Sequence, residues 1–147
     1  MTKLNFRFQS TVVMVQREVA QRILAVPNTK DFGYFSLLMQ FHFKTRRGFD
    51  VPPGAFSPKP KVVSQVIELT PQTIPLEEKS YERFLCIIST AFRQRRKTLW
   101  NNLKSRFQNE PALERSFESC GIEKKARPEQ VTLQQYLCMT RMLSFSS

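Results

Sequence analysis

The densest group of chemically competent side chains in the sequence is a run of cations at residues 93–97. No acidic residue occurs from Arg83 to Asn109, so these cations have no oppositely charged neighbour three or four residues away. On one continuous helix at roughly 100° per residue, four cations would share about a third of the circumference. These are Arg93, Arg96, Lys97 and Lys104. An unmixed basic face is typical of phosphate contacts, which release counterions, and a merely solvated face is the alternative.

Arg95 falls nearer the apolar side of the same expected helix. A buried guanidinium needs partners, because an unpaired one costs several kcal/mol. Two interpretations are open. Either the stem of Arg95 packs while its head reaches solvent, or the residue clamps this helix to a neighbouring domain.

A proline-rich segment at residues 51–62 could present an aromatic side chain. Prolines at positions 52, 53, 58 and 60 stiffen it, and Phe56 has no apolar neighbour in sequence that would bury it. Lys59 and Lys61 follow closely. An aromatic ring on a stiff, cationic loop is a platform for stacking a base, worth about 1–3 kcal/mol. The alternative is a phenylalanine that anchors the loop in the core.

Other catalytic and metal chemistries find little support in the residue types. The only histidine, His42, stands between Phe41 and Phe43 and is predicted to be a half-buried structural residue. No phosphate-binding glycine motif, zinc spacing or pair of carboxylates stands out. Three widely spaced cysteines exclude a dense disulfide framework and a CxxC metal knuckle, and suit a reducing cytosol. They are Cys86, Cys120 and Cys138.

The overall charge points to a polyanionic partner. The 147 residues include 23 Lys and Arg against 12 Asp and Glu, a formal charge of +11. This excess favours nucleic acid over a membrane surface. No apolar run approaches the roughly 20 residues that span a bilayer, and residues 1–7 lack the pattern of a secretory signal. We therefore expect a cytoplasmic protein with no membrane partner and no metal.

The elements that must position these residues divide near Pro71–Pro75. The first part predicts a strand at 10–15, a helix at 16–24, a strand or short buried helix at 34–43, and a strand at 61–69. Strands flanking the proline-rich segment suggest an antiparallel hairpin with a long excursion. The second part predicts helices at 79–107, 111–121 and 132–143. The expected fold is α/β in residues 1–70, followed by an all-α bundle in residues 76–147.

Three stretches carry a family resemblance in this order: residues 14–23, the proline-rich segment, and residues 91–99. Together they resemble the small-subunit ribosomal RNA adenine dimethyltransferases of the KsgA type. The resemblance implies methyl transfer from S-adenosylmethionine to N6 of two adjacent adenines, as part of ribosome biogenesis. It implies that residues 1–70 are the last strands of a Rossmann-like methyltransferase sheet. Residues 76–147 would be the helical domain that grips the RNA.

The resemblance also assigns roles to single residues. Phe56 matches the loop aromatic that packs against the adenine once it is flipped out of the RNA. Arg93, Arg95, Arg96 and Lys97 match the family's basic stretch. With Lys59, Lys61 and Lys104 they make up the expected RNA-binding residues. No catalytic residue is assigned.

The sequence departs from the family at the N-terminal region. Family members carry there a glycine-rich cofactor loop, an acidic residue that holds the cofactor ribose, and an Asn-x-Pro-Tyr/Phe motif, none of which is found in this sequence. The nearest string, at residues 109–112, lacks the aromatic residue. We therefore expect a C-terminal half that is inactive alone and does not bind S-adenosylmethionine by itself. We also expect an uncovered sheet face, marginal stability and self-association. The alternatives are a non-enzymatic RNA-binding or ribosome-assembly protein and, more weakly, a general basic nucleic-acid binder.

Overall fold

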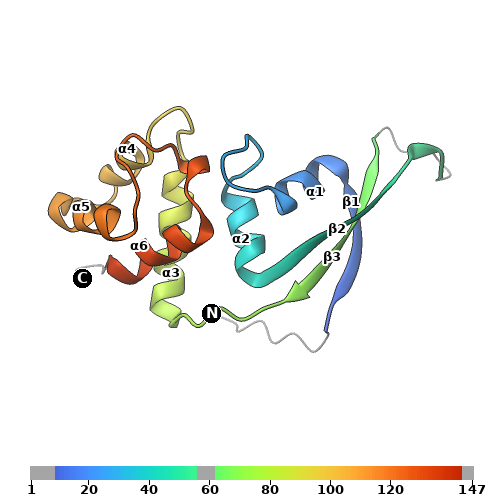
Figure 1. Ribbon diagram of the computed structural model, residues 1–147, viewed down its shortest axis with the longest axis horizontal. Helices are drawn as coiled ribbons and strands as arrows, with labels where there is room; N and C mark the ends of the chain where they lie inside the picture. The colour runs from blue at the N-terminus through green and yellow to red at the C-terminus, as the bar shows by residue number, and fades with distance from the viewer. Residues whose placement is uncertain (1–8, 56–61, 144–147) are drawn as a thin grey trace.

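A three-stranded antiparallel sheet forms one end of the molecule (Figure 1). The computed structural model describes residues 9–55 and 62–143. Strands β1 (Thr11–Gln16), β2 (Phe43–Val51) and β3 (Ser64–Pro71) lie in the order β1-β3-β2. The predicted strands at 10–15 and 61–69 are confirmed. An antiparallel hairpin flanks the proline-rich segment, but its first strand is β2, at residues that the sequence analysis did not assign to a strand.

One face of the sheet is covered by α1 (Arg17–Leu24) and α2 (Tyr34–His42). Ala20 and Ile23 of α1 pack on Ile67 and Leu69 of β3, and Met39 of α2 joins this cluster. The predicted helix at 16–24 is confirmed. The segment at 34–43, for which strand and helix were both open, is a helix.

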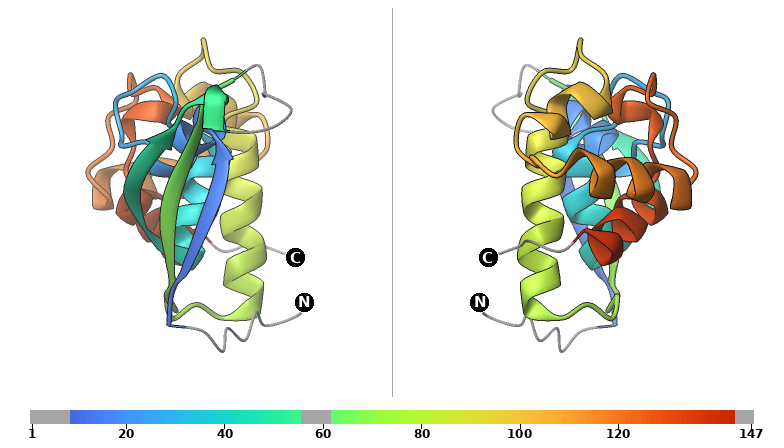
Figure 2. Two further views of the ribbon diagram at one scale, coloured as in Figure 1. Left: turned by 90° about the vertical axis from the view of Figure 1, so that its right-hand side faces the viewer. Right: turned by 90° about the vertical axis from the view of Figure 1, so that its left-hand side faces the viewer.

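The opposite face of the sheet, which we call the outer face, has no covering element among the described residues. Its apolar members are Val12, Met14 and Val66; in the β1–β3 register Met14 lies opposite Val66, and Val12 lies opposite Glu68. Val12 is 66% exposed and Met14 is 51% exposed. The left view of Figure 2 looks onto this face, with the helices behind it. The uncovered face expected from the sequence is therefore present in the structure.

The second part is a bundle of four helices: α3 (Glu78–Ala91), α4 (Leu99–Lys104), α5 (Glu110–Ser119) and α6 (Leu133–Met142). The last two match the predicted helices. Asn109 caps α5 through its side chain, and Gly121 follows that helix with a φ of +68°. Thr132 and Gln135 form the capping box that begins α6. Short 3₁₀ turns lie at Pro53–Ala55 and Pro128–Gln130.

The predicted single helix at 79–107 is wrong, because the chain leaves helical geometry between α3 and α4. One helix would have placed Arg93 three and four residues from Arg96 and Lys97, where like charges repel. Thr98 starts a new helix instead, its Oγ1 accepting a hydrogen bond from the backbone N–H of Asn101 at 3.2 Å. The apolar pattern is still satisfied, since Leu99 and Leu103 are fully buried.

The bundle and the sheet part share one hydrophobic core. Phe32, Leu37 and Phe41 pack in the same cluster as Phe84 of α3 and Tyr136 of α6. Helix α2 therefore faces the sheet on one side and the bundle on the other (Figure 1). The division at residues 70–76 stays a prediction about domains.

Two of the three cysteines are paired. A disulfide joins Cys120, at the end of α5, to Cys138 in α6, with 5.8 Å between their Cα atoms. A single bridge agrees with the exclusion of a dense framework, but the sequence did not indicate this pair. Cys86 is a free thiol. No helix within residues 9–55 and 62–143 is long and apolar enough to cross a membrane.

Candidate nucleic-acid interface

The predicted cation run lies on a turn between α3 and α4, which we call the basic loop (residues 93–97). The backbone N–H of Lys97 donates to the Gln94 carbonyl at 3.0 Å, which closes the turn. Arg93, Arg96 and Lys97 are exposed, and none of them forms an ion pair with any residue of the described chain. The loop therefore presents three uncompensated positive charges to solvent.

Asn102 holds the basic loop in shape from inside the bundle. This residue is only 5% exposed. Its side-chain amide donates to the carbonyls of Gln94 at 2.9 Å and Thr98 at 3.2 Å. Sequence reasoning missed Asn102, although an asparagine amid buried apolar positions of a helix is an available signal for such a contact.

Arg95 is exposed like its neighbours in the loop, but its guanidinium has a partner within the chain. Its Nη2 donates to the carbonyl oxygen of Phe32 at 2.6 Å, and its guanidinium lies 5.7 Å from the centre of the Phe92 ring. Phe32 precedes α2 and is fully buried. Of the two interpretations left open by the sequence, the contact matches the clamp between the bundle and the other part of the chain.

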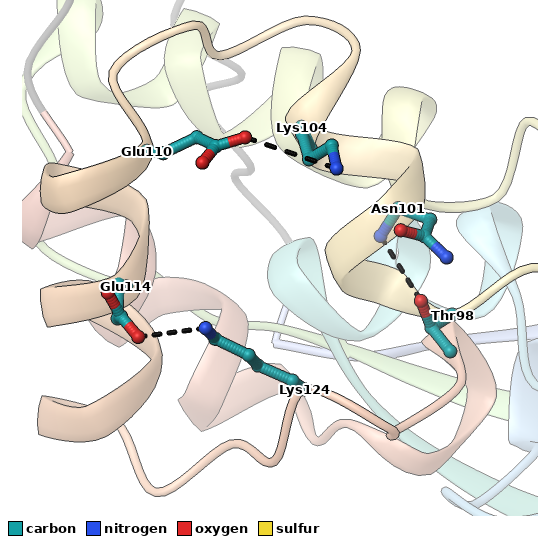
Figure 3. Close-up of polar contacts among 6 residues, drawn as sticks. All are labelled: Thr98, Asn101, Lys104, Glu110, Glu114 and Lys124. Carbon is teal, nitrogen blue, oxygen red and sulfur yellow. Dashed lines mark hydrogen bonds and ion pairs between the residues drawn. The ribbon is translucent and has the colours of Figure 1, made fainter.

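Lys104 and the basic loop do not lie on one continuous helix, as the predicted helix at 79–107 would have placed them. It is the last residue of α4, and its Nζ lies 4.0 Å from Oε1 of Glu110 at the start of α5 (Figure 3). Lys104 has no acidic residue three or four positions away, as the sequence indicates, but the fold brings a carboxylate to it from the next helix. Lys124 is paired similarly with Glu114, at 2.8 Å, and its Nζ lies 4.5 Å from the Trp100 ring centre.

Phe56, Lys59 and Lys61 lie outside the described residues, so their roles in base stacking and RNA binding stay predictions. Ala55 and Val62 are the described residues on either side of them.

His42 has the structural role that its position predicted. It is the last residue of α2, is half-buried, and its Nε2 lies 2.8 Å from the hydroxyl oxygen of Tyr81. Burial lowers the pKa of this imidazole from its usual value of 6.5. Within the described chain, no group of three His, Cys, Asp or Glu side chains could hold a metal ion.

Comparison with known proteins assigns the family. Residues 2–144 match the family described as ribosomal RNA adenine dimethylase. The chain belongs to this family. Within it, the chain is 41% identical over 137 residues to the ribosomal RNA small subunit methyltransferase A of Anaplasma phagocytophilum (strain HZ). It is 40% identical over 130 residues to the protein of the same name from Clostridium botulinum (strain Kyoto / Type A2).

The matches to these two relatives cover most of this chain but only about half of each relative. It covers 93% of the chain and 50% of the Anaplasma protein, and 88% of the chain and 47% of the Clostridium protein. The chain thus spans about half the length of the curated relatives it matches.

Solved structures agree with the fold. The 23S rRNA methyltransferase ErmE matches with a TM-score of 0.66 and 21% identity, over 92% of this chain and 55% of that one. A dimethyladenosine transferase from Plasmodium falciparum matches with a TM-score of 0.67 and 20% identity, over 90% and 56%. At these identities the likeness concerns the fold alone.

Proposed function

We propose that the chain is part of an enzyme that transfers methyl groups from S-adenosylmethionine to N6 of two adjacent adenines in small-subunit ribosomal RNA. Membership of the ribosomal RNA adenine dimethylase family supports this proposal. The relatives' name, ribosomal RNA small subunit methyltransferase A, supports the small-subunit substrate. The residues of this chain then serve to grip and orient RNA.

The basic loop is the observation that carries the RNA-binding role. Phosphates need accessible cations, and a cation already paired with a carboxylate contributes less. Arg93, Arg96 and Lys97 are accessible and unpaired with described carboxylates, while Asn102 fixes the loop that holds them. A preordered loop loses less conformational entropy when RNA binds than a loose one would.

We further propose that the sheet is the C-terminal part of a Rossmann-like methyltransferase sheet. Strand β1 lies at an edge of the three-stranded sheet and offers backbone groups for further pairing. The outer face, with Val12 and Met14 exposed, offers an apolar surface for covering helices. Both features fit a larger sheet.

S-adenosylmethionine would supply the methyl group in the complete enzyme, but the described residues do not fit it. The turn from β1 into α1 runs through Gln16 and Arg17, without the glycine that lets a backbone approach a nucleotide. The nearest cleft contains Arg17 and Arg47, which would repel the positively charged sulfonium. We propose that this 147-residue chain does not bind the cofactor alone, and titration calorimetry tests this.

The function is tested on the protein as its native cell makes it, captured through an affinity tag on this chain. We expect the captured protein to have an intact mass well above 17.2 kDa. Supplied with methyl-labelled S-adenosylmethionine and unmethylated small ribosomal subunits, it should yield labelled N6,N6-dimethyladenine. Specific binding of the ribosomal RNA without any transfer would instead favour an RNA-binding or ribosome-assembly protein. We propose the cytoplasm as its compartment, where ribosomes are the substrate.

A further inference from the structure

A cleft of about 540 Å³ lies between α1, the turn that follows it, and the inner side of β2 and β3. Two arginines reach it from different elements: Arg17 from the first turn of α1, and Arg47 from β2. Gln65 of β3 also lines the cleft, and Asp31 does so from the turn after α1. None of these four residues belongs to the basic loop or to the proline-rich segment, which supplied most of the candidate RNA contacts.

Local backbone structure aims Arg47 at this cleft. The β2–β3 register shifts between Arg47 and Asp50, as at a β-bulge, and such irregularities redirect side chains. Gly48 lies inside the shift, and a Cβ there would stand 2.5 Å from the carbonyl oxygen of Val66. Gln65, which is 2% exposed, donates from Nε2 to Oδ1 of Asp50 at 2.8 Å and fixes the far side of the shift.

The two arginines are available to an anion. Arg17 forms no ion pair with any described residue. Arg47 has one partner, Oδ1 of Asp50 at 3.8 Å, and both side chains of this pair are substantially exposed. An exposed pair at this distance is weak, so a phosphate can compete for Arg47. Asp31 is not ion-paired with either arginine.

We propose that this cleft binds one nucleotide of a single-stranded RNA segment, with its phosphate held between Arg17 and Arg47. The inference rests on the proposed function. Asp31 gives the cleft an acceptor that a bare phosphate cannot use, whereas a ribose 2′-hydroxyl can donate to it. The turn after α1 also contacts the second part of the chain: the Asn28 N–H donates to the Glu129 carbonyl at 2.7 Å, and Arg95 of the basic loop donates to the Phe32 carbonyl.

The arrangement of these parts permits one strand of RNA to use both sites. In Figure 1 the turn after α1 lies between the bundle and the sheet part. A segment gripped by the basic loop can pass over this turn and place a neighbouring phosphate at the cleft. The cleft then fixes the direction in which the strand leaves the basic loop.

The test measures binding of a fluorescent single-stranded adenine-containing RNA by anisotropy over a range of KCl concentrations. Arg17→Gln and Arg47→Gln should each weaken binding about tenfold, the loss of one charge-assisted contact. Each should also make the slope of log affinity against log salt shallower by about 0.7. Arg47→Lys, which keeps the charge, should keep the slope. Arg115→Gln is the matched control, because it removes an exposed positive charge from α5, at the opposite end of the molecule.

A variant with the opposite expected effect makes the test independent of any loss of folding. Asp50→Asn keeps the oxygen that accepts from Gln65 but removes the negative charge competing for Arg47. It should strengthen RNA binding. If Arg17→Gln and Arg47→Gln behave like Arg115→Gln, or if Asp50→Asn weakens binding, the cleft is not a nucleotide site. If the unaltered chain binds no RNA, the proposed function itself fails.

Discussion

At the residue scale, the cations of the basic loop have two different tasks. Arg96 is exposed without a described carboxylate partner, whereas Arg95 is committed to the Phe32 carbonyl. We predict that Arg95→Gln weakens RNA binding several-fold but leaves its salt slope unchanged, because it loosens the loop without removing a phosphate contact. Arg96→Gln should make the slope shallower by about 0.7, as expected for one lost phosphate contact. Anisotropy titrations at several salt concentrations distinguish the two results.

Two further measurements separate positioning from simple destabilisation. Arg95→Lys keeps a long donor that can reach the Phe32 carbonyl and should restore part of the affinity. Thermal melts should show that Arg95→Gln costs about 1 kcal/mol, the value of one hydrogen bond. Binding is then measured well below the melting temperature, where this cost does not populate the unfolded state. A shallower salt slope for Arg95→Gln would assign Arg95 to phosphate contact instead.

His42 makes a second residue-scale prediction, on the pH dependence of stability. Burial lowers the pKa of His42 below 6.5, the value of an unfolded histidine. Between those two pKa values the unfolded chain holds the proton more readily than the folded chain, so stability falls as the pH drops below 6.5. Urea unfolding of the unaltered chain at pH 7.5 and pH 5.5 should show this loss.

His42→Gln provides the control for that loss, since the chain has no other histidine. The glutamine amide can still bond the Tyr81 hydroxyl but does not titrate. Its stability should change less between the two pH values. An equal change in both proteins would place the pH dependence on the carboxylates.

At the element scale, the sequence predicted those helix ends that are determined by neighbouring residues. The proline at 111, the glycine at 121 and the Thr132–Gln135 box are read from neighbouring residues, and α5 and α6 begin and end close to where these indicate. The break after α3 was missed although its cap at Thr98 is a local signal. The other contact that holds it, from the buried Asn102 amide to the Gln94 carbonyl, forms only in the folded bundle. The Cys120–Cys138 pair was missed for the same reason.

Candidate functional residues also divide into those that local sequence reveals and those that only contacts between distant residues reveal. The basic loop was found from its composition, because a cation run without acids is visible in the sequence. The role of Arg95 was left open, since its partner Phe32 is distant in sequence. The cleft was not found at all. Arg17 and Arg47 come together only through the strand pairing and the register shift at Gly48.

The register shift itself supports an element-scale prediction. Gly48→Ala would place a methyl group 2.5 Å from the Val66 carbonyl oxygen, which belongs to rigid backbone. We expect a loss of about 1–3 kcal/mol of stability, as for overpacking. Gly54→Ala is the matched control, because among the described residues no atom beyond its chain neighbours lies within 4 Å of its Cβ position. Urea unfolding of the two variants should separate them, and equal stability would contradict the close approach of β2 to β3.

At the scale of the whole molecule, the outer face decides how the chain behaves in solution. The bundle and the inner side of the sheet are closed by packing, but Val12 and Met14 remain exposed beside the free edge of β1. An apolar face next to unpaired backbone groups favours pairing between chains. We predict that a polypeptide of these 147 residues self-associates at micromolar concentrations.

Sedimentation velocity tests this association with a pair of variants. Val12→Lys combined with Met14→Lys should shift the chain toward monomer, because charges on the outer face oppose the contact while the inner core is untouched. Val26→Lys is the control, since Val26 is 61% exposed but lies on the turn after α1, away from the outer face. If both variants shift the chain toward monomer equally, the added net charge, and not the outer face, explains the shift. If only the outer-face variant does so, this face is the surface that a larger methyltransferase sheet would cover.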